Sequence, residues 1–243
     1  MALVILWATA YKLKLWSPLL FPSPSEVWKS FVNGFSDGSF QVGLLASLRR
    51  IVVGYALSIL IGLPLGVFIA RFALARQTLG QMILGLQAMP SICWLPLAIL
   101  WFGLDEKAIL FVVVMGSLFA ITTATAGALT TIPPSLISAG ETLGATGPAL
   151  YLRVLLPAAL PPILTGLKIG WSFAWRSLMA GELLYSGVGL GRILQNGRDL
   201  GDMAQVIAAM LIIIAMGLMM ENVFFRPMEA RLHRKWGLQA ATA

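Results

Sequence analysis

Three charged residues interrupt one long apolar stretch of the sequence, about Ala158 to Leu184, and they are its strongest candidates for chemistry. They are Lys168, Arg176 and Glu182. A charge in such a stretch is costly and normally faces a bundle interior or a water-filled path. Arg176, near the middle, could therefore help to conduct an anion. The alternatives are that Arg176 pairs with Glu182 or another helix, and that Lys168 extends its head group to the cytoplasmic interface.

Threonines and tryptophans in apolar stretches are further candidates to line a path. Thr122 belongs to a threonine group in the preceding stretch, and such hydroxyls often bond to their own backbone or to a neighbouring helix. Trp171 and Trp175 lie four residues apart and so share one helical face. We expect packing roles for all three, with path lining as the alternative for Thr122 and solute contact as the alternative for the tryptophans.

Residues for catalysis or metal binding are scarce. The chain has one histidine, His233, and one cysteine, Cys93, so it lacks the clustered ligands that a membrane-embedded enzyme would need. It also lacks the G-x-x-x-x-G-K-[ST] phosphate loop. The sequence therefore predicts no cofactor, no metal site and no ATP hydrolysis by this chain.

The composition is that of a membrane protein. Of the 243 residues, 58% are hydrophobic and only 11% are charged, whereas soluble domains carry about 25% charged residues. The bilayer is therefore the expected solvent. The net charge of +7 is better explained by basic cytoplasmic loops than by a nucleic-acid partner.

The apolar runs predict an all-α protein with about six transmembrane helices in one membrane domain over residues 1–243. A spanning helix needs about 20 mostly apolar residues. The expected spans are about Ala2–Trp16, Ile51–Ala70, Gln77–Leu104, Ala108–Pro133, Ala158–Leu184 and Met203–Met220.

Basic residues set the expected orientation. Four lie after the last span, and Arg71 and Arg76 lie between the second and third spans, which favours a cytoplasmic C-terminus. The basic residues between the first two spans, Arg49 and Arg50 among them, do not fit this orientation.

The stretch "SPSE" predicts the start of a short interfacial helix between the first two spans. Ser23 can be the N-cap, Pro24 the first helical residue and Glu26 the reciprocal partner of a capping box. Val27, Phe31 and Phe35 would then share one face.

Residues 133–157 form a connection too polar and too interrupted to be part of a span. Pro134 can open a helix that Gly144 ends in a left-handed C-cap. Thr146 can cap a second helix that Pro157 stops. We expect two short helices at an angle, exposed at the membrane surface as a docking element.

This connection resembles the "EAA" loop of ATP-binding-cassette importer permeases. That pattern is Glu-Ala-Ala, three residues, Gly, nine residues and Ile-x-Leu-Pro. The residues at matching positions are Ser138, Ala139, Gly140, Gly144, Val154, Leu156 and Pro157, with Glu141 close to the missing glutamate.

Other segments resemble the nitrate, taurine and alkanesulfonate branch of this family, whose relatives also move bicarbonate and thiamine precursors. They are "LFPSPSEVW" from Leu20, "SLRRIVVGYALSILIGLPLGVFIAR" from Ser47, "MPSICWLPLAILWFGL" from Met89 and "GELLYSGVGLGRIL" from Gly181.

The resemblance implies a type I importer with a MetI-like permease fold in the inner membrane. Two permease copies would form the path, two ATPase subunits would dock on residues 133–157, and a periplasmic or lipoprotein binding protein would deliver the solute. Expected path residues are Arg176, Glu182, Trp175 and Thr122, with the glycine-rich residues 186–191 at the outer mouth. The rival from another class is a stand-alone secondary transporter or channel.

Overall fold

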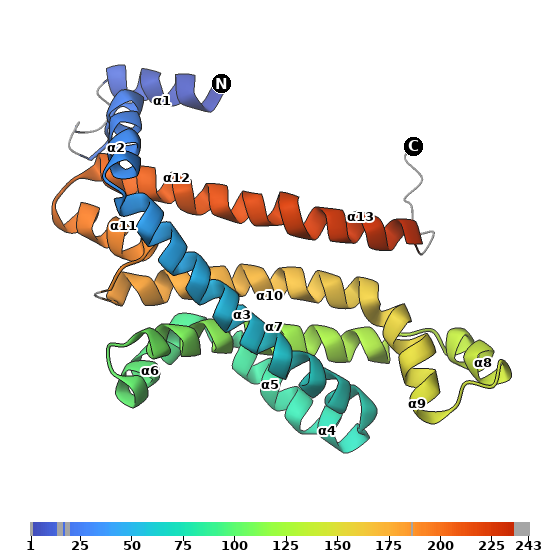
Figure 1. Ribbon diagram of the computed structural model, residues 1–243. Coiled ribbons are helices and arrows are strands. Elements are labelled where there is room, and N and C mark those ends of the chain that lie inside the picture. The colour runs from blue at the N-terminus through green and yellow to red at the C-terminus, as the bar shows by residue number, and fades with distance from the viewer. Residues whose placement is uncertain (1, 14–16, 18–19, 186, 236–243) are drawn as a thin grey trace.

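The computed structural model describes residues 2–13, 17, 20–185 and 187–235, and these form helices without a strand (Figure 1). The helices are α1 (Ala2–Lys12), α2 (Pro24–Ser36), α3 (Ser39–Arg71), α4 (Ala73–Gln77), α5 (Leu79–Ala88), α6 (Leu95–Phe102), α7 (Glu106–Thr130), α8 (Pro134–Thr142), α9 (Gly147–Leu150), α10 (Leu156–Leu184), α11 (Leu190–Asp199), α12 (Met203–Met220) and α13 (Arg226–Lys235). One 3₁₀ turn, Ser91–Trp94, and two π turns, Tyr151–Leu155 and Glu221–Phe225, complete them.

Four continuous helical stretches are long and apolar enough to cross a membrane. They are Ser39–Arg71, Glu106–Thr130, Gly147–Leu184 and Met203–Leu232. Each contains or closely matches one of the expected spans, so the all-α membrane fold predicted from the apolar runs is confirmed.

The expected span from Gln77 to Leu104 is broken rather than straight. Its two halves, Ala73–Ala88 and Ser91–Phe102, are bent by 100° at the break. Met89 has extended backbone angles (φ −76°, ψ 128°), as expected for a residue before proline. Pro90 then cannot donate the hydrogen bond that would continue the helix. The absence of charge in this run indicated its burial in lipid or protein, but not its shape.

The expected first span is too short to cross a bilayer. Helix α1 has 11 residues, about 16 Å at 1.5 Å per residue, whereas the apolar layer is about 30 Å thick. The last residues of that expected span, 14–16, lie outside the described ones. The described part of the chain therefore holds four spans, or five if the bent pair counts as one.

Helix α2 begins as the sequence predicts. The Ser23 hydroxyl accepts from the Glu26 backbone N–H, and the Ser23 N–H donates to Glu26 Oε2 over 2.7 Å. This backbone hydrogen bond lowers the pKa of the Glu26 carboxyl. Val27 is buried and the Phe31 ring contacts the Phe35 ring at a tilted angle, so one face of α2 packs on the bundle.

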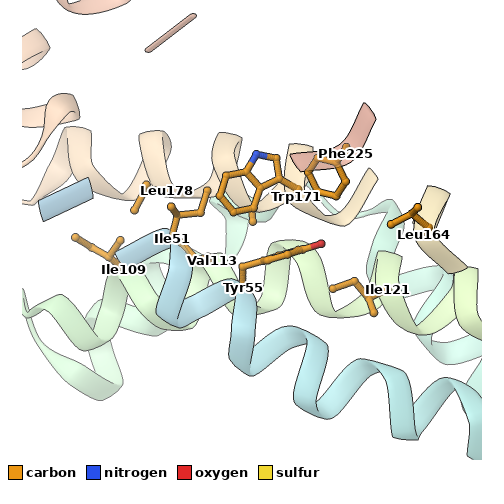
Figure 2. Close-up of a cluster of buried hydrophobic side chains, with 10 residues drawn as sticks. Ile51, Tyr55, Ile109, Val113, Ile121, Leu164, Trp171, Leu178 and Phe225 are labelled. Carbon is orange, nitrogen blue, oxygen red and sulfur yellow. The ribbon is translucent and has the colours of Figure 1, made fainter. Parts of the chain in front are cut away.

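Helix α3 crosses both α7 and α10, and the main core lies at this crossing (Figures 1 and 2). Tyr55 of α3 meets Trp171 of α10 edge-to-face with ring centroids 5.2 Å apart, and its hydroxyl donates to the Leu167 carbonyl. Phe225, in the π turn after α12, lies beside Trp171 with ring centroids 6.4 Å apart. The core cluster therefore joins four parts of the chain that are distant in sequence.

Glycines allow these helices to approach closely. A Cβ on Gly166 of α10 would lie 2.2 Å from Ala124 Cβ, and one on Gly66 of α3 would lie 2.6 Å from Thr125 Cβ. Small residues at membrane helix contacts are what permits such packing.

We expect Gly166→Val to destabilise the fold by about 1–3 kcal/mol, the usual range for overpacking. Gly217→Val is the matched control, because its Cβ would meet no atom within 4 Å outside the adjoining backbone of its own helix. Thermal unfolding of the detergent-solubilised variants measures both. Equal midpoints would contradict the close contact between α7 and α10.

Candidate functional site

Residues 133–157 project from one end of the bundle as two short helices (Figure 1). Helix α8 ends in a Schellman motif: the Ala145 N–H donates to the Gly140 carbonyl, and the Gly144 N–H donates to the Glu141 carbonyl. Gly144 has φ +86°, the left-handed conformation that favours glycine. The expected glycine C-cap is therefore present. A Cβ at this position would meet nothing within 4 Å. Glycine is therefore required by the backbone conformation and not by a lack of space within this chain.

Gly140 lies where α8 approaches the next helical turn most closely. It is buried, and a Cβ at this position would lie 2.9 Å from Val154 Cγ2 and 3.1 Å from Leu150 Cδ1. The residue that departs from the family's second alanine therefore allows α8 to pack closely on the following turn.

The expected stop at Pro157 is wrong. Helix α9 continues through the π turn into α10, and Gly147 to Leu184 form one continuous helical stretch of 38 residues. In the π turn, the Leu156 N–H donates to the Tyr151 carbonyl, five residues back. This wider turn relieves the clash that a proline ring makes with the carbonyl four residues before it. Thr146 occupies the N-cap of α9, but its side chain makes no capping hydrogen bond.

The projecting segment is anchored by its apolar ends and exposed at its tip. Ile132, Leu155 and Ile163 belong to a buried cluster at its base. Leu143, beyond the end of α8, is 88% exposed. Of the expected loop residues, Ser138, Ala139, Glu141 and Leu156 are exposed, whereas Val154 and Pro157 are half-buried.

The connection between α3 and α4 lies at the same end as this segment. The Arg71 guanidinium sits 5.7 Å from the centre of the Tyr151 ring. Helix α13 also runs toward that end, while α2 and α11 lie at the opposite one (Figure 1).

Near that opposite end, Glu182 is the centre of a buried polar network. The side chain is 0% exposed. Arg50 Nη1 donates to Glu182 Oε1 over 2.8 Å, Ser47 Oγ lies 2.7 Å from Oε2, and the Gly191 N–H donates to Oε2 over 3.0 Å. Arg50 Nη1 also donates to the Val188 carbonyl. The network thus fastens α3 and the segment after α10 to the end of α10.

This network bears on the two alternatives for Arg176, conduction of an anion and pairing with Glu182. The ion-pair partner of Glu182 is Arg50, not Arg176. Because Glu182 is enclosed in this conformation, the expectation that it lines an open path does not fit the structure. Arg176 is instead exposed, its Nε donates to the Ser172 carbonyl, and its guanidinium lies 4.6 Å from the Phe173 ring centre.

Two other expected path residues have packing contacts. Thr122 is 0% exposed and its hydroxyl donates to the Leu118 carbonyl, as expected for a membrane threonine. Trp175 is half-buried and packs against two core clusters.

Lys168, expected to extend to an interface, pairs with Glu221 and with Glu229 and so joins α10 to the C-terminal helices.

Among the glycine-rich residues after α10, residues 187–189 leave the helical conformation, as expected. Residue 186 is outside the described part, and α11 begins at Leu190. A Cβ on Gly191 would lie 2.5 Å from Glu182 Cβ, so glycine lets this segment close over the buried carboxylate.

Sequence reasoning did not identify Ser47 and Arg50 as partners of Glu182. The one hint in the sequence was that Arg50, a basic residue, did not fit the predicted orientation of the chain. Glu106, 3.5 Å from Arg50 Nε, extends the same charge cluster to α7.

Comparison with known proteins assigns the family. Residues 62–230 match the family described as the inner membrane component of binding-protein-dependent transport systems. The nitrate import permease protein of Leptolyngbya laminosa is 32% identical over 200 residues, covering 80% of this chain and 72% of that protein. The taurine transport system permease protein of Escherichia coli (strain K12) is 29% identical over 235 residues, covering 95% and 85%.

The fold agrees with this match. A solved structure of the MetNI methionine ABC transporter, in an inward-facing conformation, superposes with a TM-score of 0.69 at 21% identity, covering 78% of this chain and 94% of that one. The type I importer fold expected from the sequence resemblance is thereby confirmed. The chain belongs to the inner membrane component family of binding-protein-dependent transport systems, the permease subunits of ATP-binding-cassette importers.

Proposed function

We propose that this permease forms the path for a small anionic or zwitterionic solute of the sulfonate, taurine or nitrate class. The taurine and nitrate relatives support this class. Two copies of the chain would enclose the path, and a periplasmic or lipid-anchored binding protein would deliver the solute. An ATPase subunit would bind each copy at residues 133–157.

The observation that carries the proposal is the projecting segment and its continuity with α10. Large apolar side chains remain exposed there, among them Leu143, Leu152 and Leu156. Apolar surface gathered in one place on a protein usually marks a binding site. Because Gly147 to Leu184 form one continuous helical stretch, a movement of the docked segment is transmitted directly to the helix that carries Arg176.

The orientation follows from the same arrangement. If the ATPase binds at the projecting segment, that end is cytoplasmic. Arg71 and the start of α13 with Arg226 and Arg231 then lie toward the cytoplasm, as basic residues of inner-membrane proteins do.

We expect the purified permease alone to bind no ATP, since the sequence holds no phosphate loop. The assembled importer should hydrolyse ATP, and its binding protein with solute should raise that rate. Equilibrium binding of labelled ATP and a phosphate-release assay measure the two steps. Saturable ATP binding by the permease alone would contradict the proposal that a separate ATPase subunit binds and hydrolyses ATP.

A further inference from the structure

A hollow of about 250 Å³ lies where the broken span meets α7 and α10. Pockets for drug-sized ligands are about 300–1,000 Å³, so this one suits a smaller solute. Its lining residues come from three parts of the chain: Gln87, Ala88, Met89, Pro90 and Ser91 at the break, Met115, Gly116 and Phe119 of α7, and Phe173 and Arg176 of α10.

The hollow carries an uncompensated positive charge. A guanidinium has five N–H donors and no acceptor, and Arg176 has one donor, on Nε, engaged by the Ser172 carbonyl of its own helix. None of the ten described residues that line the hollow is acidic. The lining therefore favours an anion.

Gln87 adds donors from the broken span. Thr123 Oγ1 lies 2.8 Å from Gln87 Oε1 and 2.9 Å from the Phe119 carbonyl, and its one proton can bond either oxygen. The amide NH₂ of Gln87, with its two donors, is the part of this side chain suited to an anion. Ser91 contributes a hydroxyl to the same lining. A ligand rich in acceptor oxygens matches these groups.

The other side chains that line the hollow are apolar. They include Met89, Met115, Phe119 and Phe173. These side chains offer a ligand no hydrogen-bonding group except the weakly accepting thioethers of the methionines. A bare inorganic oxyanion would hold some of its oxygens against these side chains without partners, which is unfavourable. An organic anion can place its oxygens on Arg176 and its carbon atoms on this apolar side.

We infer that this hollow is a subsite for a small organic oxyanion of the alkanesulfonate kind. The head group binds Arg176 and Gln87, and the short tail contacts Met115, Phe119 and Phe173. The inference rests on the proposed function, in which the permease moves a small anionic solute, and it selects the organic members of that class over nitrate.

The test measures binding to the assembled importer in lipid nanodiscs without its binding protein. The titrants are ethanesulfonate, its neutral analogue ethyl methyl sulfone, and nitrate, which has no tail. Ethanesulfonate should bind more tightly than either of the others. Hydrogen bonds to a charged group contribute about 1.5–3 kcal/mol, so Arg176→Gln should weaken ethanesulfonate binding by about tenfold or more.

Two further variants make the result specific. Gln87→Met removes the amide donors at similar volume and should also weaken ethanesulfonate binding, which tests the site independently of Arg176. Arg198→Gln makes the same charge change at an exposed position on α11, outside the hollow, and should leave binding unchanged.

The inference is overturned by any of three results: no ethanesulfonate binding to the unmodified complex, nitrate binding as tight as ethanesulfonate, or unchanged affinity in both hollow variants. ATP-dependent uptake into proteoliposomes distinguishes failure of the subsite inference from failure of the proposed function. If uptake with the binding protein persists, the chain is still an importer permease and only the subsite is wrong.

Discussion

Glu182→Gln should be the most destabilising of the substitutions considered, lowering the free energy of unfolding by about 3–5 kcal/mol. Removing one member of a buried ion pair has this effect because it leaves the other charge buried without a partner. Here the remaining charge would be Arg50, whose side chain is 6% exposed and which would keep only the longer pair with Glu106 and the hydrogen bond to the Val188 carbonyl. The neutral amide also cannot accept from Arg50, Ser47 and Gly191 as the carboxylate does.

The midpoint of thermal unfolding should fall by about 6–20 °C, since 1 kcal/mol corresponds to about 2–4 °C for a chain of this size. Glu106→Gln is the graded control. Its side chain is 31% exposed and its ion pairs are longer, 3.5 and 3.9 Å, so a loss of about 0–1 kcal/mol is expected.

A double variant, Arg50→Gln with Glu182→Gln, separates charge from shape. Residues of one network are coupled, so the double variant should be less destabilised than the sum of the two single variants. Additive losses, or a Glu182→Gln midpoint equal to that of the unmodified protein, would show that the pair does not hold these helices together.

Gly144→Val should uncouple the permease from its ATPase. A non-glycine residue in the left-handed region costs about 1–2 kcal/mol, equivalent to about a 5–30-fold shift in an equilibrium, and a β-branched side chain is a clear outlier there. The strain falls on the Schellman turn that sets the angle between α8 and α9. We therefore expect at least about fivefold less ATPase to co-purify and ATP-driven uptake to fall in parallel.

Gly144→Asn is the matched variant, because asparagine also serves as a left-handed cap. It should retain co-purification and uptake. If valine and asparagine behave alike, the backbone conformation of this turn does not matter for coupling. If both variants lose the ATPase, the small size of glycine is required by the partner, since nothing in the chain itself occupies that space.

Local sequence signals predicted the elements that depend on neighbouring residues. The capping box at Ser23 and Glu26 and the helix start at Pro134 need only contacts within a few residues, and the structure has both. The long uncharged runs likewise predicted the spans. Gly144 was recognisable as a C-cap for the same reason.

Two errors in the sequence-based prediction concern prolines. Pro90 was overlooked inside an uncharged run, where hydropathy measures length and ignores a break. Pro157 was read as a stop, but the π turn before it accommodates the ring and lets the helix continue. The outcome depends on the geometry of the preceding turn, which neither hydropathy nor residue type records.

The partners of Glu182 lay beyond sequence reasoning because they are distant along the chain. Arg50 is 132 residues away and Ser47 is 135 residues away. The anomalous placement of Arg50 now has a physical account. Arg50 is paired in the buried network and so does not act as a free basic residue for topology. Arg49 is exposed and has only a 3.9 Å contact with Glu106, so the structure does not account for its placement.

The central claim, that the ATPase docks on residues 133–157, is tested most directly by site-specific cross-linking. Cys93 is first replaced by serine, so that one introduced cysteine is the only thiol. A thiol-reactive photo-cross-linker is then placed at Leu143, 88% exposed at the projecting end, or at Leu200, 80% exposed at the opposite end. With the ATPase co-expressed in membranes, position 143 should form a permease–ATPase adduct and position 200 should form none. An adduct from position 200 without one from position 143 would contradict the account.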